Sequence, residues 1–276
     1  MILALRQNPP LAWGVGILGA ILLAALIGPF VVDAGLADVG AVRPRLAPSG
    51  EFWLGTDGQG RDMVAALVLA LPQTLTIGLL AGLISLCVGV ALGLISGFVG
   101  GVTDAVIRTA SDVMMTIPGI AIMVLVASNV REMTVGIMAV IVAALSWMVA
   151  TRTIRAQTLS VRERGYVQIA RLNGVSGARL VFVEVLPNLL PFIAASFVMT
   201  VSQAMLATIG LEALGLGPQG ELTLGMIIYW AQYYSAIVRG MWWWWLPPIF
   251  LISLIFVGLM LTSVGLDSTV NKRLAR

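Results

Sequence analysis

The sequence predicts an all-α membrane protein with six transmembrane helices. Hydrophobic residues make up 59% of the chain and charged residues only 11%, which is far from the composition of a soluble domain. The apolar residues gather in six runs, each long enough to cross a bilayer as a helix. A polar interval, residues 162–191, separates the fourth run from the fifth, and its arginines place it in water.

Several kinds of chemistry are excluded by what the chain lacks. It has no histidine, the commonest general base and transition-metal ligand, and its single cysteine, Cys87, lies within an apolar run. We therefore expect neither a disulfide framework nor a metal site. The only lysine is Lys272, so a Gly-Lys-Ser/Thr nucleotide loop is absent and any ATP would be bound by another chain. The net charge of +3 reports topology, so no nucleic-acid partner is expected.

The first apolar run, Leu11 to Val32, is expected to be a membrane anchor. A cleavable signal peptide is the alternative, although the run is longer than a typical signal core. The next segment, Asp33 to Leu71, is polar and rich in turn-forming residues. These parts make up the first predicted region, residues 1–71, an N-terminal anchor helix and an outer loop. Residues 72–276 form the second, a transmembrane domain.

The outer loop contains the string Trp-Leu-Gly-Thr-Asp-Gly-Gln-Gly-Arg-Asp at residues 53–62. Three of its glycines allow tight backbone turns: Gly55, Gly58 and Gly60. We expect Asp57, Arg61 and Asp62 to cross-link the loop through ion pairs and a helix cap. The string thus predicts an ordered entry to the second helix. A catalytic carboxylate pair is the weaker alternative, because no base, nucleophile or metal ligand accompanies it.

The second and third runs are residues 72–99 and 105–127. Small residues of the second run recur at steps of three and four and share one face: Gly78, Gly82, Ser85, Gly89, Gly93 and Gly97. Such a face lets a neighbouring helix approach closely, so it predicts packing. In the third run Arg108 and Asp112 lie four apart and can pair, and Pro118 is expected to bend the helix.

The fourth run, residues 133–151, precedes a cytoplasmic interval of about residues 152–187. This interval is expected to hold a short helix over residues 165–173 that ends at Gly174. Four residues give that helix a semi-apolar face: Tyr166, Ile169, Ala170 and Asn173. The helix either inserts into a groove on a partner protein or packs on its own chain, and spacing alone does not separate the two.

The fifth run extends from Asn188 to Gly210, and polar or small residues share one of its faces: Ser196, Thr200, Gln203 and Ala207. The stripe either hydrogen-bonds helices together or lines a wet path. Gln203 is the strongest candidate, because an amide that faces lipid is costly. The sixth run, residues 242–266, opens with four tryptophans. They are expected to anchor the helix at the membrane interface, with stacking on a sugar as the alternative.

Six runs place both termini on the same side of the membrane. That side carries 11 positive residues: Arg6, Arg108, Arg152, Arg155, Arg162, Arg164, Arg171, Arg179, Lys272, Arg273 and Arg276. The other side carries 5: Arg43, Arg45, Arg61, Arg131 and Arg239. The excess predicts that both termini are cytoplasmic.

Three strings resemble those of a known family. Residues 54–62 resemble the LGTDxxGRD signature of the dipeptide, oligopeptide and nickel permeases of ABC importers. Residues 166–174, followed by Leu-Pro-Asn at 186–188, resemble the EAA loop of such permeases, with Gln168 where Glu is usual and Ile169 in place of the first Ala. Residues 211–217 are the third string, and the three strings follow one another in the order found in this family. From about Phe52 onward the chain is identified as similar to the C-type membrane subunit.

Three groups of residues are candidates for particular roles, the first through the resemblance and the other two through their spacing and chemistry. The short helix would be a coupling helix that docks on an ATP-hydrolysing subunit through Arg164, Tyr166, Gln168, Ile169, Ala170, Arg171, Asn173 and Gly174. The substrate path would include Ser196, Thr200 and Gln203. The loop before the second helix would be a structural element built on Gly55, Thr56, Asp57, Gly60, Arg61 and Asp62.

The implied function is that of the membrane subunit of an ABC importer in the bacterial inner membrane. Its expected partners are a second homologous permease, two ATP-binding subunits, an extracytoplasmic substrate-binding protein and membrane lipid. No cofactor is expected in this chain; ATP and Mg would belong to the partner subunits, so the chain itself is not an enzyme. Di- and oligopeptides are the expected substrates, with oligosaccharides as the alternative. An ATP-independent channel or carrier is a weaker alternative.

Overall fold

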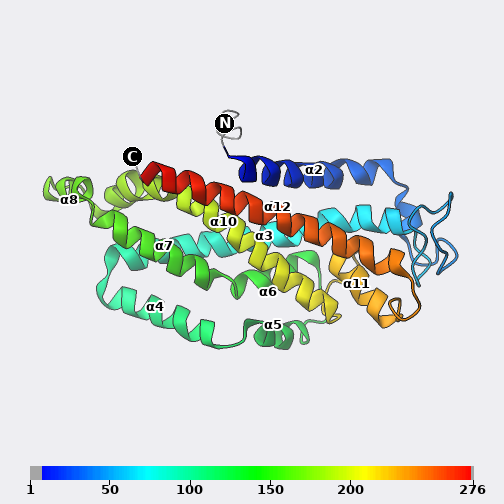
Figure 1. The fold of residues 1–276 in the computed structure, drawn as a ribbon. Helices are drawn as coiled ribbons and strands as arrows, with labels where there is room; N and C mark the ends of the chain where they lie inside the picture. The colour runs from blue at the N-terminus through cyan, green and yellow to red at the C-terminus, as the bar shows by residue number, and fades with distance from the viewer. Residues whose placement is uncertain (1–7, 275–276) are drawn as a thin grey trace.

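The computed structural model describes residues 8–274, and the regular elements of this part of the chain are all helical (Figure 1). In chain order they are α2 (Pro9–Val31), η1 (Ala34–Ala37), α3 (Met63–Val99), α4 (Gly101–Thr116), α5 (Gly119–Ala127), α6 (Val135–Ala144), α7 (Trp147–Arg162), α8 (Gly165–Leu172), α9 (Gly177–Arg179), η2 (Leu180–Val185), α10 (Leu186–Ala213), α11 (Leu224–Tyr233) and α12 (Trp242–Leu274). The short element η1 is a 3₁₀ turn and η2 is a π-helical stretch.

Four helical segments are long and apolar enough to cross a membrane: Pro9–Val31, Met63–Val99, Gly177–Ala213 and Trp242–Ser268. Two further candidates are bent pairs, α4 with α5 at 79° and α6 with α7 at 47°. The first bend confirms the break predicted at Pro118, which caps α5. The second was not predicted. It lies where Ser146 turns its hydroxyl back to donate to the Val142 carbonyl at 2.7 Å, a bond that competes with the helical ladder.

Three helices extend further than the apolar runs predicted. Helix α3 begins at Met63, nine residues before Pro72, because Asp62 caps it by accepting from the Ala65 amide at 2.8 Å. Helix α7 continues to Arg162 and α12 to Leu274. Hydropathy marks where the bilayer would end, whereas a helix continues into water as long as its backbone is capped and paired.

The long helix α3 runs through the middle of the bundle (Figure 1), and its glycine row is the packing face that the sequence predicted. Gly78 and Gly82 face Met205 and Val201 of α10. The glycines later in the row face α7. A Cβ added at Gly93 would lie 2.8 Å from the Thr151 carbonyl oxygen, so these backbones touch. Ser85 joins the row by donating to the Ala143 carbonyl.

The loop before α3 is ordered by its own polar side chains. The Thr56 hydroxyl donates to the Arg43 carbonyl at 2.7 Å, and Asp57 Oδ1 accepts from the amides of Gln59 at 2.8 Å and Arg61 at 2.9 Å. Positive φ angles of 64° at Gly55 and 76° at Gly60 require glycine. The predicted turns and cap are therefore present.

The predicted ion pairs of this loop are not present. Arg61 forms no ion pair within residues 8–274, and its Nε atom is buried without a hydrogen bond. Burial raises the pKa of Asp57 above its ordinary value, although three backbone amides oppose the shift, and burial lowers the pKa of Arg61. The loop is held by amides and by Trp243, whose indole donates to the Thr56 carbonyl at 3.2 Å.

The four tryptophans at residues 242–245 do not all lie at a surface, as interfacial anchoring would require. Trp244 is fully buried and packs on Gly58, while Trp242 is about half exposed. The cluster therefore joins α12 to the loop before α3, and only part of it is free to meet lipid or a ligand.

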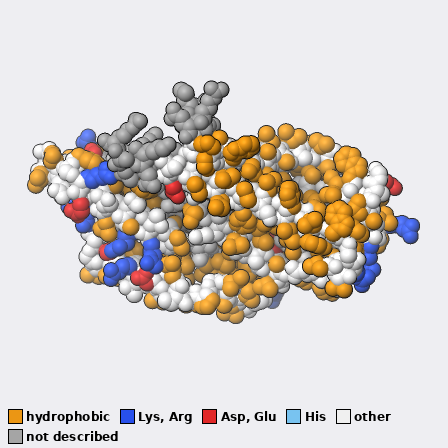
Figure 2. Space-filling view, viewed as in Figure 1, with side chains coloured by type: hydrophobic (Ala, Val, Ile, Leu, Met, Phe, Trp, Pro, Cys, Tyr) orange, Lys and Arg blue, Asp and Glu red, His pale blue; other side chains and the backbone are white. Residues whose placement is uncertain are grey.

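The molecule is elongated, with α8 near one end and residues 33–62 and α11 at the other (Figure 1). Charged side chains gather toward both ends, and apolar side chains cover the surface between them (Figure 2). This distribution fits a chain whose long axis lies across a bilayer.

Candidate functional site

Helix α8 forms the free tip of one end of the molecule (Figure 1). It starts directly after Arg164, whose extended backbone separates it from α7. It ends at Gly174, where φ is +79° and the Val175 amide donates to the Ala170 carbonyl at 3.2 Å. This left-handed glycine cap is the stop that the sequence predicted.

One side of α8 is anchored to its own chain. Val167 is fully buried and belongs to an apolar cluster that includes Ile154 and Val161 of α7 and Leu180, Val185 and Leu189 of the segment leading into α10. Ala170 packs against the same cluster. Ala170, one of the four residues of the predicted semi-apolar face, thus packs on its own chain, because helical spacing places it beside Val167.

The opposite side of α8 exposes a row of large apolar residues. Tyr166, Ile169 and Leu172 lie three residues apart and are 39%, 61% and 86% exposed. The sequence prediction named the first two and missed Leu172, the most exposed, although its spacing from Ile169 could have identified it. One face of the helix thus packs on its own chain and the other is free, and insertion of the free face into a partner stays a prediction.

The remaining residues predicted for coupling lie around this exposed row. Arg164, Gln168, Arg171, Asn173 and Gly174 are all exposed. The Gln168 amide donates to the Glu163 carbonyl at 3.2 Å, so it joins α8 to the end of α7. The Arg171 guanidinium carbon lies 5.7 Å from the centre of the Phe98 ring at the end of α3.

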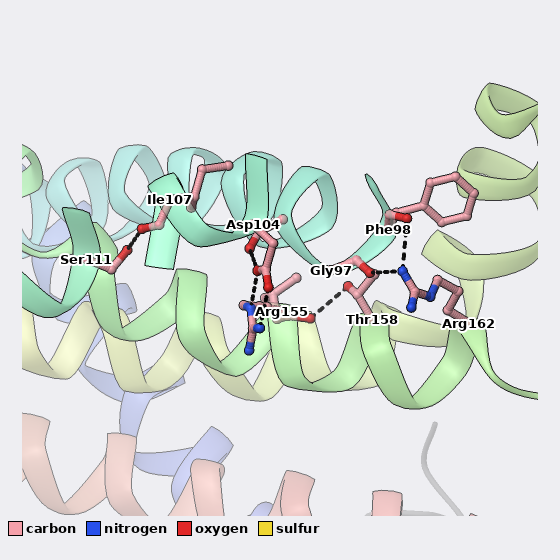
Figure 3. Close-up of polar contacts among 10 residues, drawn as sticks. Gly97, Phe98, Asp104, Ile107, Ser111, Arg155, Thr158 and Arg162 are labelled. Carbon is pink, nitrogen blue, oxygen red and sulfur yellow. Dashed lines mark hydrogen bonds and ion pairs between the residues drawn. The ribbon is translucent and has the colours of Figure 1, made fainter. Parts of the chain in front are cut away.

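The last turns of α7, next to α8, are tied to the junction between α3 and α4 (Figure 3). Arg162 Nη1 donates to the carbonyls of Gly97 at 3.1 Å and Phe98 at 3.2 Å, which are free acceptors at the end of α3. Arg155 donates from Nη2 to Asp104 Oδ2 at 2.6 Å, and both side chains are about four-fifths covered. A two-pronged ion pair of this kind fixes orientation as well as distance.

The pairing predicted within the third run is wrong. Asp112 forms its ion pair with Arg152 of α7 at 3.5 Å instead of with Arg108 one turn before it. The sequence cannot indicate such a pair, because the partner lies 40 positions away and meets Asp112 only when α4 and α7 pack. The Arg155–Asp104 and Arg152–Asp112 pairs both join α7 to α4, so the helix that precedes α8 is fixed to α4.

Beyond this junction, α10 lines a polar cavity of about 400 Å³ together with α7 and α12. Its polar lining comprises the three residues predicted for a path, Ser196, Thr200 and Gln203, together with Thr153, Gln157 and Asp267. The Gln203 amide forms no hydrogen bond with any residue in the described part of the chain. Ala207, expected on the same face, packs instead against an apolar cluster built around α6.

Three polar residues of the cavity were missed from the sequence. Thr153 and Gln157 lie four apart on α7, a spacing that could have marked them as one face. Asp267 was placed in a tail, because hydropathy ends the sixth run at Leu266, but α12 carries it on along the same axis. The three polar residues of the predicted stripe and these residues together give the cavity a mixed lining, unlike the apolar faces around it.

Long apolar helices, charged ends and a polar cavity between helices define a multi-pass membrane protein with a candidate transport path. Residues 89–276 match the family described as binding-protein-dependent transport system inner membrane component, and the chain belongs to this family. The predicted resemblance to C-type permeases of the dipeptide, oligopeptide and nickel ABC importers is confirmed. The chain is thus an inner-membrane permease subunit.

Three relatives illustrate the similarity. The oligopeptide transport system permease protein OppC of Mycobacterium tuberculosis is 29% identical over 81% of this chain and 77% of its own length. A putative peptide permease protein of Brucella suis is 30% identical over 87% of this chain and 80% of its own. The dipeptide transport system permease protein DppC of Bacillus subtilis is 28% identical over 99% of this chain and 84% of its own.

Proposed function

We propose that this chain is the transmembrane subunit of an ATP-driven importer that moves di- and oligopeptides into the cytoplasm by alternating access. In this proposal it crosses the membrane six times, with each bent helix pair as one span, and both termini are cytoplasmic. It assembles with a second permease, two ATP-binding subunits and an extracytoplasmic substrate-binding protein. ATP and Mg belong to the ATP-binding subunits.

The observation that carries this proposal is the two-sided character of α8. Its row of Tyr166, Ile169 and Leu172 is exposed at the tip of the molecule, while Val167 fixes the opposite side in an apolar cluster. Large apolar residues at a surface tip are costly unless a partner covers them. An amphipathic helix held by one face is suited to fill a groove on an ATP-binding subunit with the other.

The contacts of α8 supply a route from the tip to the cavity. The cluster around Val167 includes Leu180, Val185 and Leu189, which lead directly into α10, the helix that lines the polar cavity. When the ATP-binding subunits close, α8 moves with them and displaces this cluster. The cavity helix and α7 then reorient together, which opens the path toward one side of the membrane or the other.

A second route links α8 to α3 and α4. Arg162 holds the carbonyls that end α3, and the pair Arg155 and Asp104 holds the start of α4. Both arginines lie on α7, which precedes α8 directly. A movement of the tip is therefore transmitted to four helices by packed or charge-assisted contacts.

The names of the relatives support peptides as the substrate class. Oligosaccharides are the second candidate, because exposed aromatic rings lie at the end opposite α8. Tyr233 is 66% exposed and meets Trp230 edge to face at 5.7 Å, and Trp242 is also exposed. Such rings stack on sugars, but they also suit a membrane interface.

The test is ATP turnover by the full assembly in lipid nanodiscs. The binding protein would be loaded in one arm with a peptide mixture and in the other with oligosaccharides. Stimulation by peptides alone supports the proposal, and stimulation by oligosaccharides alone assigns the second candidate. If no ATP-binding subunit joins the complex, the importer proposal fails and an ATP-independent channel or carrier replaces it.

A further inference from the structure

A cavity of about 800 Å³ lies outside the proposed path. It is a groove between the second half of α3 and the segment that runs from α9 into α10. Its lining consists of apolar side chains, one cysteine and one glycine: Leu86, Cys87, Val90, Ala91, Leu94, Ile95, Phe98, Val99, Gly177, Ala178, Val181, Phe182, Leu186 and Ile193. It shares no lining residue with the polar cavity proposed as the path.

The dimensions of the groove match a lipid chain. Its α3 wall extends from Leu86 to Val99, which at the helical rise is about 20 Å along the helix axis. One leaflet of a bilayer has a hydrocarbon depth of roughly 15 Å. An acyl chain lying in the groove would thus run from the middle of the membrane to the boundary with water at the α8 end.

Positive charge surrounds that end of the groove. Phe98 marks its last turn, and the Arg171 guanidinium lies over the Phe98 ring while Arg162 donates to the Phe98 carbonyl. Arg179 follows the lining residue Ala178 and is exposed. Arg162 pairs with Glu163 at 3.2 Å, but Arg171 and Arg179 form no ion pair within residues 8–274.

Charge and shape together identify the occupant. A wholly apolar trough that ends in unpaired arginines complements a molecule with a hydrocarbon chain and an anionic head. Within residues 162–193 the acidic residues are Glu163 and Glu184, and the arginines outnumber them. A neutral lipid would fill the trough without using the arginines, and a helix of another protein would not require them.

We propose that this groove is a binding site for an anionic phospholipid of the cytoplasmic leaflet. One acyl chain lies along α3 from Leu86 to Phe98, and the phosphate is held by Arg171 and Arg179. The site is distinct from the transport path, so it goes beyond the proposed function, although it uses the same membrane orientation. Because Phe98 contacts both the lipid and Arg171 of α8, the bound lipid supports the base of the tip.

The experiment is photo-crosslinking in nanodiscs that contain the intact assembly. Phosphatidylglycerol and phosphatidylcholine, each with a diazirine in one acyl chain, are added at equal dose to separate samples, and adducts are located by mass spectrometry. We expect adducts within residues 86–99 and 177–193, at least about fivefold more with phosphatidylglycerol. Equal labelling by the two lipids would overturn the head-group assignment.

Two pairs of variants test the contacts with the lipid head group and with the acyl chain separately. Arg179→Gln is expected to reduce phosphatidylglycerol labelling about fivefold and to leave phosphatidylcholine labelling unchanged, while Arg131→Gln, in the loop between α5 and α6, changes neither. Ala91→Trp fills the groove and reduces labelling by both lipids; Val88→Trp, exposed on α3 but outside the lining, does not. Labelling that survives Ala91→Trp, or adducts replaced by crosslinks to the second permease, would refute the site. None of these readouts requires transport, so failure of the importer proposal is distinguishable.

Discussion

Gly174 has a conformation that other residues adopt only at a cost. Its φ of +79° ends α8, while Gly165 at the start of the same helix has no positive φ and equally open surroundings. We expect Gly174→Ala to destabilise the end of α8 by about 1 kcal/mol, and Gly165→Ala to be neutral or slightly stabilising. Hydrogen exchange of residues 165–175 would show faster exchange in the first variant alone. Equal exchange in both would mean that the cap is unimportant.

Gln203 is the residue on which the path proposal depends most. Because its amide has no hydrogen-bond partner within the described structure and lines the polar cavity, Gln203→Phe is expected to reduce transport at least fivefold while the complex still assembles. The control is Leu206→Phe, on the same helix, exposed and outside the cavity. Transport into proteoliposomes and the yield of assembled complex are the two measurements. Loss of assembly in Gln203→Phe would favour a packing role for Gln203.

At the scale of elements, the stability of the bundle depends on how closely α3 and α7 approach. We expect Gly93→Ala to cost about 1–3 kcal/mol, because the new methyl group meets the Thr151 carbonyl and the Ile154 Cβ, both of them part of a packed helix. Gly16→Ala on α2 meets nothing within 4 Å and serves as the control. Thermal unfolding of the purified chain in detergent should show a lower midpoint for Gly93→Ala only. An unchanged midpoint would contradict the packing role of the row.

The same elements show what could be predicted from the sequence. Spacing of small residues predicted the contact face of α3, and a glycine after an amphipathic stretch predicted the end of α8. Both signals are local, so they need no knowledge of the fold. The pairing of Asp104 with Arg155 and the burial of Trp244 depend on which helices meet, and the sequence does not specify this. Asp267 was missed for a different reason, because hydropathy was used to end a helix.

At the scale of the whole molecule, the chain is elongated and its middle part is suited to a membrane. Apolar surface lies between two charged ends (Figure 2), and α8 extends beyond one of them (Figure 1). Contacts from α7 and α8 join that tip to α3, α4 and α10. In the proposed function, these contacts carry a movement of α8 into the membrane-spanning helices.

The central claim is that the exposed row of α8 docks on the ATP-binding subunit, and Leu172→Asp tests it most directly. Loss of a buried leucine contact at an interface is expected to weaken capture of the ATP-binding subunit by about tenfold or more, with a parallel loss of substrate-stimulated ATP turnover. Val102→Asp, at the start of α4, is similarly exposed and should change capture less than about twofold. If Leu172→Asp captures the ATP-binding subunit as well as the unaltered chain does, α8 is not the coupling helix.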